Sequence, residues 1–135
     1  MSRKKIVVRY ADGRLVRGYA DNFPLDGALF HVRQLDPALA GRSVKVSLKE
    51  LKAVFFVRDF SGNPAYREKK HFAAHQQPEG RRVEVTFVDD GEVLVGSTPG
   101  HEPGEPGFFV TPADPHSNNE KVFVISSSIS RFRYI

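Results

Sequence analysis

The chain contains no cysteine. It can therefore form neither a disulfide framework nor a thiolate nucleophile, which fits a reducing compartment. It also lacks any apolar run near the roughly 18 residues that a membrane-spanning helix needs. The basic start from Met1 to Lys5 leads into a short strand-like run, where a signal peptide would have a longer apolar core. We therefore expect a soluble, cytoplasmic protein with no membrane partner.

Recognisable catalytic patterns are missing as well. Ser126 to Ser128 lack the context of a nucleophile elbow. Residues 100–107 separate their glycines with prolines, are acidic and precede a strand-like run, whereas a phosphate loop precedes a helix. His71 and His75 have the spacing of a metal-binding pair, but Phe72 stands where a metalloprotease has glutamate. We therefore predict that the protein is not an enzyme and has no cofactor and no physiological metal site.

Short runs of alternating apolar and polar residues are present instead. Hydrophobic residues make up 40% of the chain and aromatic residues 11%, which argues for a folded globule. No segment sustains a period near 3.6, so the pattern predicts β-strands and not long helices. In the first half of the chain the predicted strands are 5–10, 14–19, 28–32, 43–48 and 51–60.

The second half of the chain repeats the plan of the first. Asp12-Gly13 and Asp90-Gly91 each stand between β-rich runs, a strong hairpin signal because glycine accepts the positive φ of a tight turn. A shift of 78 residues aligns 12–57 with 90–135 without a gap, with nine identities in 46 positions. Gly18 and Gly96 are one such pair, and a glycine inside a strand indicates a bend or bulge. The second set of predicted strands is 83–87, 92–97, 108–112, 120–126 and 130–135.

These observations predict an all-β protein of two tandem five-stranded small barrels of the SH3-like or Sm-like kind. The first barrel covers residues 1–60 and the second 81–135. A linker over 61–80 joins them, in which Asn63-Pro64 is typical of a helix start and 66–75 is predicted as a short helix.

The spacing V-x-Y-x-D-G-x-x-x-x-G, followed by a turn and an apolar third strand, resembles the opening motif of the Sm-like fold. That family's late Arg-Gly or Lys-Gly motif is replaced by Lys49-Glu50 and Ser127-Ser128, so no RNA-contact residue is carried over. The segments KAVFFVRDF and GFFVTPADPHSNNEKVFV resemble those of an uncharacterised family of bacterial proteins with this duplicated layout. Both resemblances imply architecture only.

Two groups of residues are candidates for binding. The first is a basic set whose counterparts in the second repeat are mostly uncharged, which predicts a partner-binding face on the first barrel; its members are Arg14, Arg17, Arg33, Lys45 and Lys52. The second is a polar loop suited to recognition, although Asx turns explain the same composition without a ligand; its members are Asp114, His116, Ser117, Asn118 and Asn119.

The formal net charge is +4, which permits an acidic partner or nucleic acid without requiring either. We expect a non-enzymatic binding or adaptor module that acts in protein–protein or regulatory contacts. One alternative is RNA or single-stranded nucleic-acid binding by the basic face of the first barrel. Another is sensing of an anionic small ligand such as a nucleotide. Open strand edges also predict pairing of the units, within the chain or as a homodimer.

Overall fold

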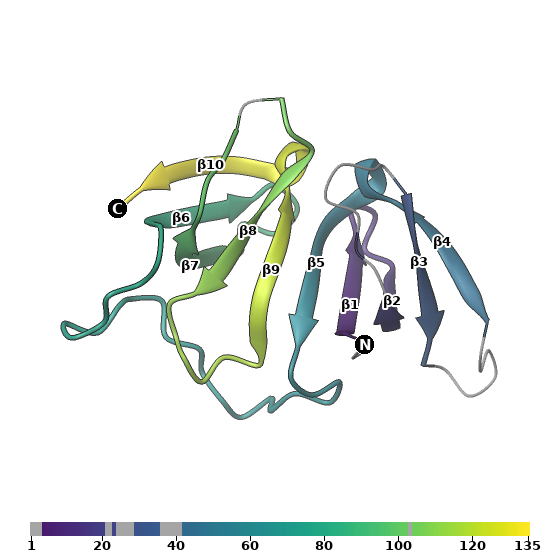
Figure 1. Ribbon diagram of the computed structural model, residues 1–135, viewed down its shortest axis with the longest axis horizontal. Coiled ribbons are helices and arrows are strands. Elements are labelled where there is room, and N and C mark those ends of the chain that lie inside the picture. Colours follow the sequence, from purple (N-terminus) through teal and green to yellow (C-terminus); the bar gives the residue numbers. More distant parts are fainter. Residues whose placement is uncertain (1–3, 21–22, 24–28, 36–41, 103) are drawn as a thin grey trace.

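Ten β-strands form one continuous antiparallel sheet in the computed structural model of the protein (Figure 1). The structure describes residues 4–20, 23, 29–35, 42–102 and 104–135. Within this part of the chain there is no α-helix, and no helix is long and apolar enough to cross a membrane. The all-β prediction is therefore confirmed.

The sheet consists of two halves with the same internal strand order. The N-terminal half contains β1 (Lys4–Tyr10), β2 (Leu15–Ala20), β3 (Leu29–Gln34), β4 (Ser43–Ser47) and β5 (Leu51–Val57). The C-terminal half contains β6 (Arg81–Phe87), β7 (Val93–Thr98), β8 (Gly107–Pro112), β9 (Asn119–Ile125) and β10 (Ile129–Tyr134). The order across the sheet is β10-β6-β7-β8-β9-β5-β1-β2-β3-β4, so the fifth strand of each half lies beside its first.

The spacing of the elements also repeats. β7, β8 and β10 begin 78 residues after β2, β3 and β5. The 3-10 turns η2 (Leu48–Glu50) and η3 (Ser126–Ser128) have the same separation, and each leads into the fifth strand of its half. Gly13 and Gly91 have φ values of 95° and 72°, in the left-handed region that the two hairpin turns require.

The structure does not show the two tandem five-stranded barrels that we expected; β5 and β9 pair edge to edge, the within-chain pairing that the open edges predicted, and join the halves into one open sheet. Their antiparallel register aligns Ala53 with Val124 and Phe55 with Val122. All seven residues of β5 are buried, which explains why this stretch is the densest apolar cluster of the sequence. It is a central strand that is covered on both faces.

The prediction of a helix over 66–75 is wrong. The Tyr66 N–H donates to the Asn63 carbonyl in a single turn, and the Lys69 N–H then donates to the Asp114 carboxylate at 2.9 Å. A continuing helix would have needed that N–H for an i to i−4 bond. The loop after β8 therefore binds this segment and holds it against the C-terminal half without a helix.

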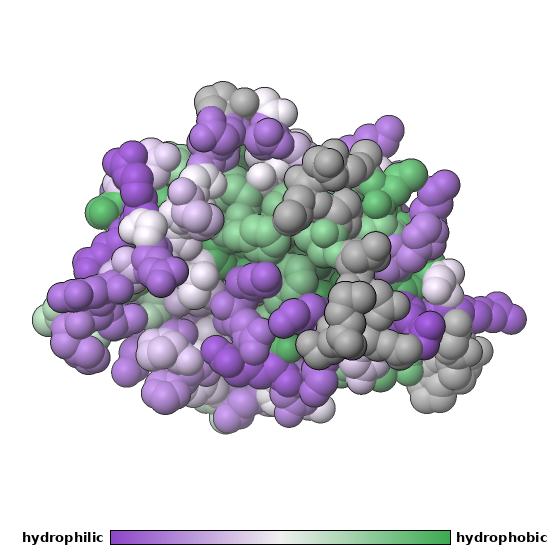
Figure 2. Space-filling view, viewed as in Figure 1, coloured by the Kyte–Doolittle hydropathy of each residue, from purple (hydrophilic) through white to green (hydrophobic). Residues whose placement is uncertain are grey.

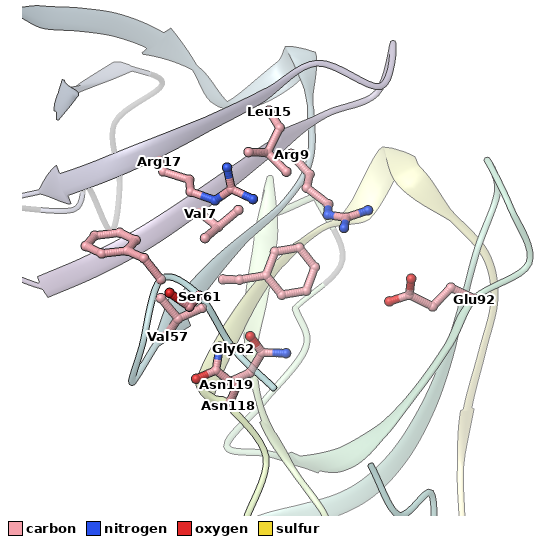
Figure 3. Close-up of a pocket in the computed structure, with 12 residues that line it drawn as sticks. Val7, Arg9, Leu15, Arg17, Val57, Ser61, Gly62, Glu92, Asn118 and Asn119 are labelled. Atoms are coloured by element: carbon pink, nitrogen blue, oxygen red, sulfur yellow. The ribbon is translucent and has the colours of Figure 1, made fainter. Parts of the chain in front are cut away.

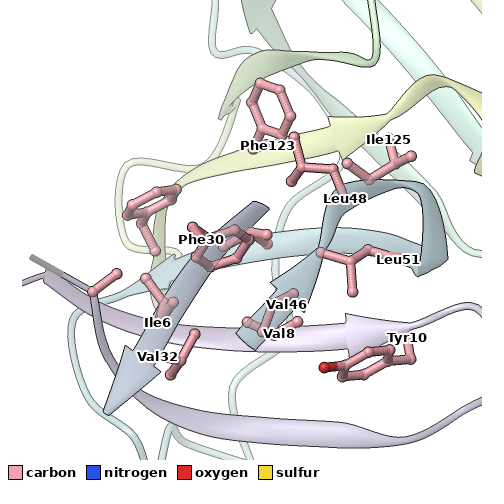
Figure 4. Close-up of a cluster of buried hydrophobic side chains, with 13 residues drawn as sticks. Ile6, Val8, Tyr10, Phe30, Val32, Val46, Leu48, Leu51, Phe123 and Ile125 are labelled. Atoms are coloured by element: carbon pink, nitrogen blue, oxygen red, sulfur yellow. The ribbon is translucent and has the colours of Figure 1, made fainter. Parts of the chain in front are cut away.

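Two hydrophobic cores lie on opposite faces of the sheet. Val54 and Phe56 of β5 belong to the core of the N-terminal half, whereas Ala53, Phe55 and Val57 belong to the core of the C-terminal half. Such alternation follows from the period of two along a strand. Figure 4 shows the N-terminal core, to which Phe123 and Ile125 of β9 also contribute. In the space-filling view, apolar surface gathers over the middle of the molecule, where β9 and β5 meet, with hydrophilic side chains around it (Figure 2).

Candidate functional site

The outer face of β1–β4 is the most strongly charged surface of the N-terminal half. The side chains of Ile6, Val8 and Tyr10 of β1 are buried in the N-terminal core. Because successive side chains of a strand point to opposite faces, the residues that alternate with the buried ones on each strand point outward. The register then places Lys5 opposite Tyr19, Val7 opposite Arg17, Tyr19 opposite Arg33 and His31 opposite Lys45. We call this surface the basic face; its outward residues on β1–β4 are Lys5, Val7, Arg9, Leu15, Arg17, Tyr19, Leu29, His31, Arg33, Ser43, Lys45 and Ser47.

None of these outward strand residues is acidic, and five of them carry a permanent positive charge: Lys5, Arg9, Arg17, Arg33 and Lys45. The corresponding face of the C-terminal half includes Glu84, which receives two hydrogen bonds from Arg133. A surface with a single sign of charge focuses a positive potential outward, and that potential attracts anions.

The structure brings together three of the five basic residues that the sequence singled out: Arg17, Arg33 and Lys45. Arg14 lies instead at the β1–β2 turn, where its Nε binds the Asp12 carboxylate at 2.8 Å and its guanidinium covers the Tyr10 ring. The Arg14 backbone N–H and this ion pair hold the pKa of the Asp12 carboxyl below its usual range.

Lys52 is a correction to the predicted binding set, because only 2% of it is exposed. Its ammonium lies 3.2 Å from Asp89, 3.4 Å from Asp90 and 3.8 Å from Glu92, in the hairpin turn between β6 and β7. The Glu92 N–H and then the Lys52 ammonium hold the pKa of the Asp90 carboxyl below its usual range. Lys52 thus links β5 to the C-terminal half and leaves no charge for an external partner.

Sequence reasoning missed Lys5 and Arg9 as members of the basic face. The gapless comparison of the two repeats began at residue 12, so it did not include these two positions. The alternation of β1 carries the missing signal, because it sets Lys5 and Arg9 opposite to the buried Ile6, Val8 and Tyr10. The cross-strand register then adds them to Arg17 and Tyr19.

A cavity of about 250 Å³ opens at the end of the basic face, where β1 and β2 approach the C-terminal half (Figure 3). Arg9 and Arg17 lie on one side of it and Asn118 and Asn119 on the other, and Glu92 approaches from the C-terminal half. Its apolar lining comes from Val7, Leu15, Phe55, Val57 and Phe60.

Two aromatic rings stand beside this cavity. Tyr19 and Phe60 pack edge to face, with ring centroids 5.4 Å apart. The Lys5 ammonium lies 5.9 Å from the centre of the Phe60 ring. Partly exposed rings beside cations are the combination that stacks nucleobases along a charged groove.

The polar loop after β8 uses much of its hydrogen-bonding capacity inside the chain. Asp114 is 2% exposed, and its carboxylate accepts from the Tyr66 hydroxyl and from the N–H groups of Lys69 and His116. The buried Ser117 hydroxyl donates to Glu68.

Asn118 completes this set of internal hydrogen bonds. It donates to the Asp59 carbonyl at 2.9 Å and accepts from the Asp59 N–H at 3.1 Å. The loop therefore anchors the 59–69 segment, and its use in recognition stays a prediction for His116 and Asn119.

His71, His75 and His116 line a second cavity of about 220 Å³, together with Lys69 and Asp114. Among the residues that the structure describes, no group of three or more histidines and carboxylates is arranged to hold a metal ion. The i, i+4 spacing of His71 and His75 implied a shared helical face, but these residues form no helix in the structure.

Acid is expected to release the linker segment through Asp114. Burial alone raises the pKa of this carboxyl, but the donors from Lys69, Tyr66 and His116 outweigh it, so the pKa lies below its usual range. A lowered pKa in the folded protein means that the stabilisation is present above about pH 4 and is lost as the pH falls further. Asp114→Asn should therefore unfold with a weaker dependence on pH between pH 5 and 3 (roughly the window set by the unfolded carboxyl).

The same variant offers a local readout at neutral pH. Loss of charge-assisted hydrogen bonds at Asp114 is expected to cost about 2 kcal/mol and to expose Arg67, Lys69 and Lys70 to trypsin. Limited proteolysis followed by mass spectrometry measures this cleavage. Glu79→Gln, in an exposed position of the same linker, is the control. Equal cleavage rates for wild type and Asp114→Asn would contradict the anchoring role.

Comparison with known proteins identifies one family model, described as a family of unknown function (DUF6982), which matches residues 2–135. No curated protein and no solved structure matches the chain.

Proposed function

The chain belongs to this DUF6982 family of unknown function, and we propose that it is a non-enzymatic binding module that holds single-stranded nucleic acid across the basic face. The observation that carries the proposal is the composition of that face. Its strand residues include five permanent cations and no carboxylate. Neutralisation of backbone phosphates by lysine and arginine is the main source of affinity in proteins that bind nucleic acid, whatever their sequence preference.

The aromatic rings favour a single strand over a duplex. Tyr19 and Phe60 lie beside Lys5 and at the border of the cavity that contains Arg17. Bases of a single strand are free to stack on such rings, whereas those of a duplex are already stacked on one another.

A protein partner, the main expectation from sequence, fits this surface less well. Cores of protein interfaces are more apolar than the rest of the surface and are depleted in lysine, although arginine is enriched there. On the basic face the exposed aliphatic residues Leu15 and Leu29 stand apart, on different strands. An acidic protein segment remains a competitor, which the following experiment distinguishes.

In this duplicated unit of the small-barrel type, the two halves have different roles: the N-terminal half binds and the C-terminal half supports it. We infer duplication from the shared strand order and the repeated 78-residue spacing; the Sm-like or SH3-like character and the bacterial origin rest on the sequence resemblance. The C-terminal half contributes β9, the three carboxylates around Lys52 and the anchoring loop. It therefore acts as the structural partner of the half that binds.

Affinity for a single-stranded dodecamer is expected to fall steeply with salt. If all five cations bind phosphate, the slope of log K against log salt should approach about −3.5, taking roughly −0.7 for each phosphate neutralised on a single strand. Fluorescence polarisation of a labelled dodecamer between 50 and 300 mM salt measures this slope. Duplex DNA of the same length and polyglutamate serve as competitors. No measurable binding at low salt would contradict the proposal, and stronger competition by polyglutamate than by unlabelled dodecamer would favour an acidic protein segment.

A further inference from the structure

We propose that the cavity between the two halves holds one nucleotide, with its phosphate on Arg9 and Arg17 and the edge of its base on the Asn119 carboxamide. The inference rests on the proposed function when the nucleotide is one unit of a bound strand. A free nucleotide presents the same chemistry, and the experiment below separates the two sources.

The phosphate site follows from the strand register. Arg9 pairs with Leu15 and Arg17 with Val7, so the two arginines occupy diagonal positions on neighbouring strands. Diagonal positions lie close enough for long side chains to meet at one ligand. Figure 3 shows both guanidinium groups on the same side of the cavity, above Val7. Two planar guanidiniums around one anion suit the tetrahedral oxygens of a phosphate group.

The base site follows from the opposite wall and the lining. Phe55 and Val57 line the cavity but are only 9% and 8% exposed, and the Arg9 guanidinium lies 5.9 Å from the centre of the Phe55 ring, so the half-buried Phe60 offers most of the apolar surface for a planar ring. Asn119 is the cross-strand partner of Val57, so it lines the cavity beside this surface on the neighbouring strand. A carboxamide both donates and accepts, so it can read the edge of a base. Asn118 is excluded from this role because Asp59 already occupies its side chain.

Glu92 sets the selectivity. Its carboxylate lines the cavity from the C-terminal side and lies 3.8 Å from the Lys52 ammonium; the acceptor sites that this pairing leaves open repel a second phosphate and accept a hydrogen bond from an amino group. The site therefore suits a monophosphate unit over a di- or triphosphate, and a base with an exocyclic amine over uracil. The volume of about 250 Å³ lies just below the range of sites for drug-sized ligands, as expected for a single nucleotide.

Nuclear magnetic resonance of the full ¹⁵N-labelled chain tests the assignment with AMP, UMP, adenosine and inorganic phosphate. AMP is expected to shift the side-chain signals of Arg9, Arg17 and Asn119, and inorganic phosphate those of the arginines alone. Adenosine and UMP should bind at least about threefold more weakly than AMP. The assignment is wrong if AMP moves none of these signals, or if it moves only those that phosphate moves.

Variants separate the cavity from the rest of the basic face. Arg9→Gln and Asn119→Ala should each lower the affinity for AMP about tenfold, because each removes a hydrogen-bonding group from the ligand's surroundings. Lys45→Gln, on the basic face but outside the cavity, should leave AMP binding unchanged and weaken binding of the labelled dodecamer. Unchanged AMP affinity in both cavity variants would overturn the assignment.

Failure of this inference is distinguishable from failure of the proposed function. If the dodecamer binds and AMP leaves the cavity signals unmoved, strand binding stands and the nucleotide site is wrong. If AMP binds in the cavity and the dodecamer does not bind, a free nucleotide is the ligand and the strand-binding function is wrong.

Discussion

Gly18→Ala and Gly96→Ala are each expected to lower the free energy of unfolding by about 3 kcal/mol, the upper part of the range for overpacking a folded interior. A Cβ at Gly18 would lie 2.1 Å from the Arg33 carbonyl oxygen, and a Cβ at Gly96 would lie 2.1 Å from that of Thr111. These atoms belong to the backbone of the neighbouring strand, so no side-chain rotation relieves the clash. The strands would have to separate where β2 pairs with β3 and β7 with β8.

Three other glycines provide matched controls. Gly13 and Gly91 have open space around them but positive φ, so alanine there should cost about 1 kcal/mol through backbone strain alone. Gly100 has neither constraint, and alanine should be neutral or slightly stabilising. Urea unfolding followed by circular dichroism measures the series. A Gly18→Ala variant as stable as Gly100→Ala would contradict the close approach of the strands.

The sequence predicted the strands well because the burial of one face of a strand determines the character of alternate residues. Alternation placed Val44, Val46 and Leu48 inward, and all three pack in or against the N-terminal core. The paired Asp-Gly turns and the 78-residue shift located the equivalent elements of the second half. Each of these signals is local or depends on comparing the chain with itself.

Pairing of the two units within the chain was predicted from their open edges, but the strands that pair, β5 and β9, were not. Pairing of β5 with β9 depends on which edges of two units meet, and a buried strand reads as apolar whether it closes a barrel or continues a sheet. The burial of Lys52 could not be predicted from the sequence either. A lysine on a predicted strand is ordinarily a surface charge, and its burial follows only from the position of Asp89, Asp90 and Glu92 in the other half.

The charges on the two edge strands of the sheet disfavour pairing with a strand of another molecule. β4 and β10 form the two edges, and Lys45 of β4 and Arg131 of β10 carry the same sign of charge. Meeting of these edges from two molecules would bring the cations together, a device that protects edge strands against association. A homodimer by edge pairing stays a prediction, and on this argument it forms more readily at high salt, where the repulsion is screened.

The double variant Arg17→Glu/Arg33→Glu is expected to lower the affinity for a single-stranded dodecamer about hundredfold at low salt, roughly tenfold for each charge-assisted hydrogen bond removed. Both residues lie on the basic face, on the neighbouring strands β2 and β3. The salt dependence should weaken as well, by about 1.4 in the slope of log K against log salt, since two fewer phosphates are neutralised. Both side chains are exposed, so the free energy of unfolding should change by no more than about 0.5 kcal/mol.

Lys49→Glu/Arg131→Glu is the control that distinguishes a defined face from overall charge. Both positions are exposed and outside the basic face, and the two double variants bring the formal net charge of +4 to the same value. A diffuse electrostatic attraction depends on that net charge, so it would be reduced equally in both variants. Binding to a defined surface depends on which charges are reversed, so the control should retain affinity within about threefold of wild type. Equal reductions in the two variants, measured by fluorescence polarisation at matched salt, would overturn the basic face as the binding site even if the wild-type protein binds the strand.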